Sequence, residues 1–217
     1  ELTICGGGAL NIDGNYKDGI ASKDGLIIVN GTIVVSARDD GIRGKDYLIV
    51  EGGEITLDVG GDGLKSTNND TESVGYVLVE GGTLYIVSGA DGIQAETDVI
   101  ITGGTLTLTS GGGSSSSIGA DDSAKGIKGN SSVAVTGGAF AISSADDAIH
   151  SNGNITIDAG IFNISTGDDG IHADGSVTIN AGEIDITKSY EGIEGSEITI
   201  NGGLIHIASS DDGINTS

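Results

Sequence analysis

A short acidic motif, Asp-Asp-Gly-Ile or a close variant of it, recurs along the whole of this 217-residue chain. Its third residue falls at Gly19, Gly41, Gly63, Gly92, Gly126, Ala148, Gly170, Gly192 and Gly213. Successive copies are therefore 22, 22, 29, 34, 22, 22, 22 and 21 residues apart. A period that is nearly constant over so many copies predicts a solenoid, in which each repeat stacks on the one before it.

Each period carries the same alternating pattern of apolar and polar residues. Two alternating runs, such as residues 47–50 (Tyr-Leu-Ile-Val) and 54–57 (Glu-Ile-Thr-Leu), flank a glycine pair such as Gly52-Gly53. Alternation with a period of two predicts half-buried strands, and the glycines supply the positive φ that a tight corner needs. No segment shows helical periodicity of useful length, and proline is absent.

These patterns predict an all-β fold, a parallel β-helix with about 22 residues and three short strands per coil, in eight to nine coils. Equivalent residues of neighbouring coils would then lie about 4.8 Å apart. The thin interior of such a coil suits small branched side chains, in agreement with an aromatic content of 3% and the absence of Trp and Met. We expect residues 1–217 to form one such domain, a fragment that lacks terminal caps.

Two coils are longer than the others. The interval from Gly63 to Gly92 holds seven extra residues, which we place near residues 66–72. The interval from Gly92 to Gly126 holds twelve extra residues, around residues 111–117 and 121–122. We expect both insertions to flank the acidic corner, because insertions in solenoids collect on one face that is often the binding face. The Gly/Ser-rich run at 111–117 equally suits a plain flexible surface loop.

The balance of charge restricts the partners of this chain. It holds 32 acidic and 9 basic residues, for a formal net charge of −23. Nucleic acid is excluded as a partner, because binding to phosphates needs clustered positive charge. No apolar run is long enough to span a membrane. The single cysteine, Cys5, cannot form an internal disulfide, and we expect it to be buried as a small apolar residue.

The acidic residues of the motif form a column along one edge of the predicted solenoid. Like charges stacked about 4.8 Å apart repel by about 1 kcal/mol even in water. A hydrogen bond from a side chain to its own turn explains one acid per corner, but it does not explain adjacent pairs that repeat. The candidate metal ligands are Asp18, Asp39, Asp40, Asp62, Asp91, Asp121, Asp122, Asp146, Asp147, Asp168, Asp169, Glu191, Asp211 and Asp212.

Calcium ions would relieve this repulsion. Ca²⁺ takes about six to eight oxygen ligands, so carboxylates from neighbouring coils can share one ion. We therefore predict several Ca²⁺ ions along the column. Three His and one Cys supply few ligands for softer metals. His150 and His172 are one coil apart and in register, so that a zinc pair at these residues is an alternative.

Cationic side chains gather beside the acidic column. The position after the corner Ile or Leu holds the candidate ligand-binding residues Arg43, Lys65, Lys128, His150 and His172. One interpretation is compensation of the charge of the aspartates. The other is a groove that binds a linear polymer of uronates, because the carboxylates of such a chain coordinate calcium and pair with Arg or Lys.

The repeated Asp-Asp-Gly-Ile, the Gly-Gly-x-Ile-x-Ile pattern and the run Lys125-Gly126-Ile127-Lys128 resemble the clostridial secreted carbohydrate-binding β-helix family, which is related to family 9 polysaccharide lyases. The resemblance covers essentially the whole chain. It implies a right-handed parallel β-helix with calcium held between coils by the corner acids. It also implies an extracellular or cell-surface location and binding to plant cell-wall polysaccharides, both polygalacturonate (pectin) and cellulose. Ala148 and Glu191 depart from the motif and put the metal at their coils in question.

Two other functions remain open from the sequence. A calcium-dependent pectate lyase would need a Lys or Arg as general base, and Lys65 or Lys128 could serve. If the chain only binds its polymer, it has no catalytic residue. The third hypothesis is a purely structural, calcium-stiffened surface stalk or adhesin. Cellulose is the weaker candidate ligand, because the chain has five Tyr and no Trp with which to stack on flat sugar rings.

Overall fold

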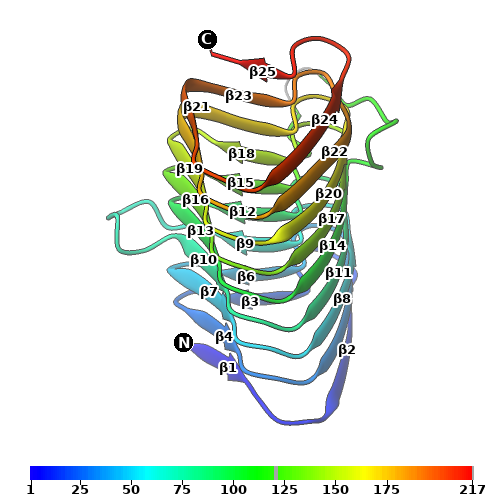
Figure 1. Cartoon of the computed structure of the whole chain (residues 1–217). Helices are drawn as coiled ribbons and strands as arrows, with labels where there is room; N and C mark the ends of the chain where they lie inside the picture. The colour runs from blue at the N-terminus through cyan, green and yellow to red at the C-terminus, as the bar shows by residue number, and fades with distance from the viewer. Residues whose placement is uncertain (120–121, 217) are drawn as a thin grey trace.

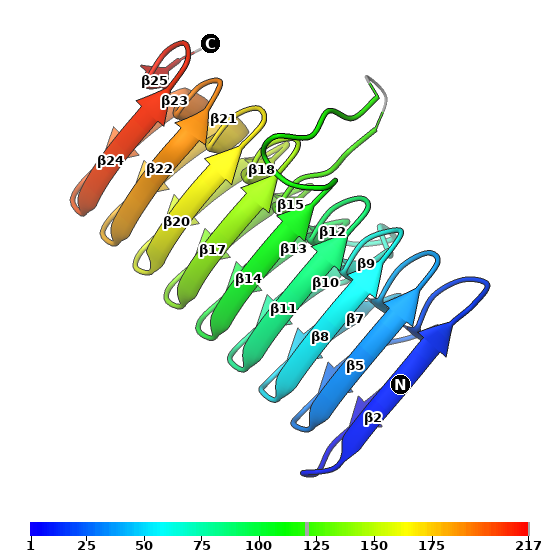
Figure 2. The same ribbon diagram turned by 90° about the vertical axis from the view of Figure 1, so that its right-hand side faces the viewer.

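The computed structural model describes residues 1–119 and 122–216, and over these residues the chain forms a parallel β-helix (Figure 1). Successive coils stack along one axis between the two ends of the chain, and each coil contributes a strand to each of three faces (Figure 2). The strand pairs are parallel throughout the described residues, so the predicted all-β solenoid is confirmed. Within the same residues, no helix has the length and apolar character needed to cross a membrane.

The first face is a nine-stranded sheet of long strands that end at the acidic corner. Its members are β2 (Ala9–Gly14), β5 (Thr32–Ala37), β8 (Glu54–Val59), β11 (Thr83–Ser88), β14 (Thr105–Ser110), β17 (Ala139–Ser144), β20 (Ile161–Thr166), β22 (Glu183–Ser189) and β24 (Leu204–Ser209). The second face, of short strands, begins just after that corner. Its members are β3 (Ile20–Ser22), β6 (Ile42–Gly44), β9 (Leu64–Ser66), β12 (Ile93–Ala95), β15 (Ile127–Gly129), β18 (Ile149–Ser151) and β25 (Ile214–Asn215).

The third face closes each coil and is joined to the second face in one 16-stranded sheet. It consists of β1 (Leu2–Ile4), β4 (Leu26–Ile28), β7 (Tyr47–Val50), β10 (Tyr76–Val79), β13 (Asp98–Ile101), β16 (Ser132–Val135) and β19 (Asn154–Ile157). Two longer strands, β21 (Ile171–Ile179) and β23 (Ile193–Ile200), run through both of these faces. The described residues therefore make nine coils, at the upper end of the predicted eight to nine.

The Gly-Gly pairs form the turn between the third face and the first. The second glycine of each pair has a positive φ, for example 100° at Gly53 and 101° at Gly104. Residues with a side chain rarely adopt this conformation, so glycine is needed there. The turn function predicted for these pairs is therefore confirmed.

Ladders of similar aliphatic side chains fill the interior. One ladder starts the second face and consists of Ile20, Ile42, Leu64, Ile93, Ile127, Ile149, Ile171 and Ile193, which are all buried. The widest interior side chains, Phe140 and Phe162, stack face to face with ring centroids 4.4 Å apart. Because each apolar residue packs on its equivalent in the next coil, the core is continuous along the axis although each coil is thin.

The two insertions project at different corners, so the expectation of a single face is wrong. The first insertion lies between β9 and β10, at the corner between the second and third faces. The second lies between β14 and β15, at the acidic corner, and the two loops leave the body on opposite sides in Figure 1. Repeat spacing gives the number of extra residues but not the corner that accommodates them. Cys5, expected to be buried, is also exposed.

The glycine of the acidic motif is needed for close packing. A Cβ added at Gly63 would lie 2.4 Å from Ile86 Cγ2 and 2.5 Å from the carbonyl oxygen of Gly92. Both distances are well below ordinary van der Waals contact, so the corner can approach the first face only without a side chain. The coil of Ala148 accommodates a methyl group here, and that residue is buried.

We expect Gly63→Ala to lower the stability of the fold by about 1–3 kcal/mol, because the new methyl group overpacks the corner. Thermal melting followed by circular dichroism measures the effect. Gly213→Ala is the matched control, because it changes the same position of the motif where no atom lies within 4 Å of the added Cβ. Equal losses of melting temperature in the two variants would contradict this packing role.

Candidate functional site

The acidic corner has two positions with different environments. We use the name corner column for the set of residues that precede the corner Gly or Ala, one from each coil. The column is buried in most coils; Asp91 is 3% exposed and Asp147 is 2% exposed. The preceding acids Asp39 and Asp168 are exposed to solvent. The corner column consists of Asp18, Asp40, Asp62, Asp91, Lys125, Asp147, Asp169, Glu191 and Asp212.

Hydrogen bonds between coils explain the burial of the column. The backbone N–H of Asp62 donates to Asp40 Oδ1 at 3.1 Å, and that of Asp91 donates to Asp62 Oδ1 at 2.8 Å. The same bond joins Asp169 to Asp147 at 3.1 Å and Glu191 to Asp169 at 2.9 Å. One carboxylate oxygen per coil therefore holds the next corner in place, and the other oxygen is left for a cation.

The second oxygen of the column meets the row of cationic side chains predicted beside it. Each member of this row lies three residues after the column residue of its own coil. We call the row the donor row, and it consists of Arg43, Lys65, Gln94, Lys128, His150 and His172. The strand register confirms the predicted alignment, pairing Arg43 with Lys65, Lys65 with Gln94, Gln94 with Lys128, Lys128 with His150 and His150 with His172. Each cationic member lies within 4 Å of a carboxylate of the column.

The ion pairs of the donor row differ in closeness. Arg43 Nη2 lies 2.6 Å from Asp18 Oδ2, and Lys65 Nζ lies 2.6 Å from Asp62 Oδ2. Lys128 Nζ is 3.8 Å from Asp91 Oδ2 and therefore holds its carboxylate more loosely. The structure thus supports charge compensation for Arg43 and Lys65, whereas Lys128 keeps more freedom to meet another anion.

Lys125 interrupts the acidic column. It occupies the column position before Gly126, and its Nζ lies 2.7 Å from Asp146 Oδ1 and 2.9 Å from Asp147 Oδ2. The prediction that Asp122 is an acid of this corner is wrong, because Lys125 holds the position before Gly126. Asp122 lies in the loop before the corner, where its Oδ2 accepts the backbone N–H of Gly119. Asp121 lies outside the described residues.

The last corners are weaker candidates for a metal site. Glu191 is paired with Asn215, whose Nδ2 donates to both carboxylate oxygens at 3.0 Å. Asp211 and Asp212 are both exposed.

Among the described residues, four groups of ligand atoms lie close enough together to hold an ion, all atoms of each group being within 4.8 Å of one another. Two groups contain only carboxylates and match the hard-oxygen ligands of calcium. They are Asp18 with Asp39 and Asp40, and Asp146 with Asp147 and Asp168. The other two contain histidine: Asp147 with His150 and His172, and Asp169 with His172 and Glu194.

Crowded carboxylates perturb their own ionisation. Partial burial and the charges of Asp147 and Asp146 raise the pKa of Asp168. Burial, followed by the charges of Asp147 and Asp168, raises the pKa of Asp169 to about 7. Burial is the larger cause of both shifts and the neighbouring carboxylates add to it, and a bound cation would favour the ionised forms.

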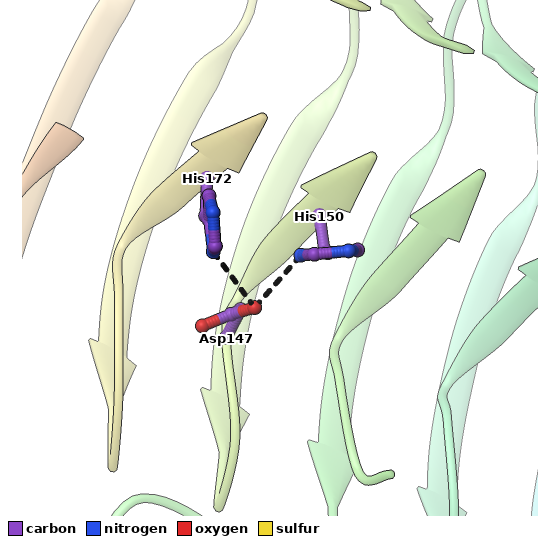
Figure 3. Close-up of side chains that lie close together, drawn as sticks. All are labelled: Asp147, His150 and His172. Carbon is purple, nitrogen blue, oxygen red and sulfur yellow. Dashed lines mark hydrogen bonds and ion pairs between the residues drawn. The ribbon is translucent and has the colours of Figure 1, made fainter. Parts of the chain in front are cut away.

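Asp147 is the most strongly paired acid of the column. Although burial opposes ionisation, contacts from His150, His172 and Lys125 hold the pKa of Asp147 well below its usual range. The imidazoles of His150 and His172 both approach Asp147 (Figure 3). This interaction raises the pKa of His172 to about 9.

Two grooves flank the loop that carries residues 111–119. One has a volume of about 580 Å³ and is lined by Asp62, Lys65, Asp91, Gln94, Glu96 and Lys128 together with loop residues. The other, of about 560 Å³, is lined by Lys125, Asp146 and Asp168 and by the opposite side of the loop. Ile118 and Asp122 line both grooves, so the loop divides the acidic edge into two compartments.

The raised pKa of His172 predicts a fall of stability with rising pH in the metal-free protein. A histidine with a folded-state pKa of about 9 and an unfolded value near 6.5 contributes stability below about pH 6.5 and loses it up to about pH 9. The raised pKa of Asp169 acts in the same direction between about pH 4 and 7. Urea unfolding in the presence of a chelator should therefore give a lower free energy of unfolding at pH 9 than at pH 6.5.

His172→Gln should flatten this dependence above pH 6.5, because it removes the titrating group beside Asp147 and Asp169. Lys23→Gln, which removes an exposed basic residue elsewhere, controls for net charge. An unchanged slope in His172→Gln would contradict the assignment.

Comparison with known proteins identifies the family of this chain. A family model described as a carbohydrate-binding domain-containing protein matches residues 1–170 and 169–213. No curated protein matches the sequence. A solved structure of the polysaccharide lyase-like protein from C. thermocellum, in its gadolinium derivative, matches with 18% identity and a TM-score of 0.38 over 98% of this chain and 86% of that chain. Because the family model spans nearly all of the sequence, the chain belongs to the carbohydrate-binding domain-containing family, and its partner is a carbohydrate.

Proposed function

We propose that this chain is a calcium-stabilised extracellular protein that binds acidic plant cell-wall polysaccharide, with polygalacturonate, the backbone of pectin, ahead of cellulose as the ligand. The observation that carries the proposal is the groove of about 580 Å³ beside the donor row. It combines basic residues with a hydrogen-bond acceptor that the protein itself leaves unused.

The basic residue best placed for a uronate carboxylate is Lys128. Its side chain is 23% exposed, and its nearest carboxylate oxygen, on Asp91, is 3.8 Å away. An ammonium group in this situation can turn to a ligand carboxylate without breaking a close ion pair. Gln94, on the neighbouring coil, lines the same groove.

Gln94 contributes an acceptor for sugar hydroxyls. Its Oε1 is buried and has no hydrogen-bond partner among the described residues, while its Nε2 donates to Glu96 at 3.3 Å. A buried acceptor without a partner costs free energy. Once the side-chain amide turns toward the groove, a hydroxyl that donates to Gln94 Oε1 would recover that cost, so the groove suits a polyhydroxylated ligand.

The regular spacing of the coils favours a polymer. Strand pairing repeats the donor row about every 4.8 Å along the axis. A linear polysaccharide lying along this edge would meet similar groups at each coil. The acidic polymer is favoured because the donor row carries positive charge at several of its positions.

Cellulose is less well matched than polygalacturonate. Tyr47 and Tyr76, the aromatic pair at the start of the third face, stack on each other with ring centroids 5.6 Å apart and planes inclined by 18°. Their faces therefore cover one another and do not offer a flat platform for neutral sugar rings.

The raised pKa of Lys65 favours polymer binding over a lyase reaction. Contacts with Asp62 and Asp40 raise the pKa of Lys65, although burial opposes the shift. A general base must be deprotonated near neutral pH, and a raised pKa moves this amine away from that requirement.

Calcium would act where carboxylates outnumber the cationic side chains. Asp146 and Asp168 lie on neighbouring coils in one of the two all-carboxylate groups and line the second groove. We infer that they share a Ca²⁺ ion that bridges coils, while Lys125 keeps its contact with Asp146 Oδ1.

Calcium should raise the melting temperature, and chelation should lower it, because an ion bound only to the folded state adds about 2.7 kcal/mol at a hundredfold excess over its Kd. Asp168→Asn should leave the metal-free protein as stable as before or slightly more stable, since it removes a repelling charge. The same variant should lose part of the calcium-dependent increase. Asp58→Asn, on the exposed side of β8, is the control, and an equal response to calcium in Asp168→Asn would refute the bridging site.

Lys128→Gln should weaken binding of polygalacturonate about 10-fold, the effect expected for loss of one charge-assisted contact. Isothermal titration at a fixed salt concentration measures it, with Lys23→Gln as a control of equal charge away from the groove. Absence of binding to any acidic or neutral glucan would instead favour a structural stalk. Steady formation of unsaturated product in the same mixture would identify a lyase.

A further inference from the structure

The two histidines of the donor row lie differently from the other in-register rings. Tyr47 and Tyr76 stack with planes 18° apart, and Phe140 and Phe162 with planes 3° apart. The planes of His150 and His172 are instead perpendicular, at 90°, with centroids 5.0 Å apart. Both rings are turned so that a nitrogen faces Asp147 (Figure 3). Directed polar contacts, rather than ring stacking, therefore fix their orientation.

The distances between Asp147 Oδ2 and the two histidine nitrogens are close to the edges of a tetrahedral metal site. Asp147 Oδ2 lies 2.9 Å from His150 Nδ1 and 3.6 Å from His172 Nδ1. His172 Nδ1 is also 3.6 Å from Asp169 Oδ2, but Asp169 belongs to a separate group and would have to turn toward the ion to supply a fourth ligand atom. Ligands about 2.0–2.1 Å from a tetrahedral ion are about 3.3 Å from one another. An ion could thus enter the cluster with small side-chain rotations.

The outer nitrogen of His150 has a hydrogen-bond acceptor, and that of His172 lies near two carboxylates. His150 Nε2 lies 2.9 Å from Asn152 Oδ1. His172 Nε2 lies 3.6 Å from Glu194 Oε2 and 3.7 Å from Asp174 Oδ1. An Nε2–H directed at these oxygens leaves the Nδ1 lone pair for a metal, which is the arrangement that orients histidine ligands in metalloproteins. The metal would replace the proton between Nδ1 and Oδ2.

The surrounding charge also favours a dication. Asp146, Asp168 and Glu194 lie around the cluster in addition to the two candidate carboxylate ligands. Lys125 is the opposing charge, at 2.9 Å from Asp147 Oδ2. Its Nζ also contacts Asp146 Oδ1 at 2.7 Å, so it can remain paired there when an ion takes Asp147.

We propose that Asp147, His150 and His172, with Asp169 or water as a fourth ligand, form a binding site for a divalent transition ion such as Zn²⁺, distinct from the calcium sites. Two imidazole nitrogens and one carboxylate form a ligand set that suits zinc, cobalt or nickel and does not suit calcium. The site joins two neighbouring coils of the second face. It does not depend on the proposed sugar ligand.

Tag-free protein with Co²⁺ gives the first test. In excess calcium, Co²⁺ should bind at one site per chain and show the intense visible absorption of tetrahedral cobalt, and Zn²⁺ should abolish it by displacement. Failure of both ions to bind in the presence of excess calcium would overturn the proposal. So would the weak absorption of an octahedral cobalt complex.

Variants then assign the ligands. His150→Gln and His172→Gln should each weaken Zn²⁺ binding more than 10-fold by isothermal titration, and Asn152→Ala about 10-fold through loss of the outer contact to His150. His206→Gln is the matched control, because this third histidine pairs with Asp185 on the exposed side of the first face. Asp168→Asn should lose calcium stabilisation but keep zinc binding. Equal zinc affinity in wild type and both ligand variants would overturn the assignment.

Discussion

The in-register stacking of parallel strands is the constraint on which the rest of this molecule depends. Each residue lies one strand spacing, about 4.8 Å, from its equivalents in the coils on either side. Apolar residues gain from this arrangement, because Ile20, Ile42 and Leu64 extend a single ladder through the interior. Acidic residues lose from it, because the same geometry stacks carboxylates of like charge. The acidic edge therefore needs compensation that the core does not.

Two features of the corner reduce that repulsion. The first is a backbone N–H of the next coil, which donates to one oxygen of a column acid, as that of Asp91 does to Asp62. The second is the donor row, which places a cation against the other oxygen, as Lys65 does for Asp62. At Lys125 the compensation moves into the column itself, since an ammonium group takes the position that an aspartate holds elsewhere. Between them these contacts account for the buried acids, while the exposed first acids keep uncompensated charge.

Regular spacing made much of this predictable. The 22-residue period and the alternation of residues gave the parallel β-helix, and the alignment of Arg43, Lys65, His150 and His172 followed directly from it. The difference between the two acids of a pair did not follow. The Asp-Asp dipeptide looks symmetric in sequence, but the bend of the chain at the corner leaves one side chain buried against the next coil and the other exposed to solvent.

The irregular coils were the least predictable part. Spacing placed Gly126, and therefore Lys125, at the corner of its coil, and the pairing of Ile127 with Ile149 agrees. It could not show that Asp122 lies in the loop before this corner. Nor could it show that the insertion after β9 leaves from a different corner.

The acidic edge offers ligands of different chemistry because the column has two sets of neighbours, the acids before it and the donor row. Where the neighbouring groups are carboxylates, as at Asp146 and Asp168, the local ligands are hard oxygens that suit calcium. Where the donor row supplies imidazoles, as at His150 and His172, the same backbone geometry presents nitrogen to a softer ion. Where it supplies lysine, no metal is needed at all, and a loosely held ammonium such as that of Lys128 is free for an anionic ligand. The chemistry of each coil thus depends on the acid before the column as well as on the residue three positions after it, while the fold only repeats the frame.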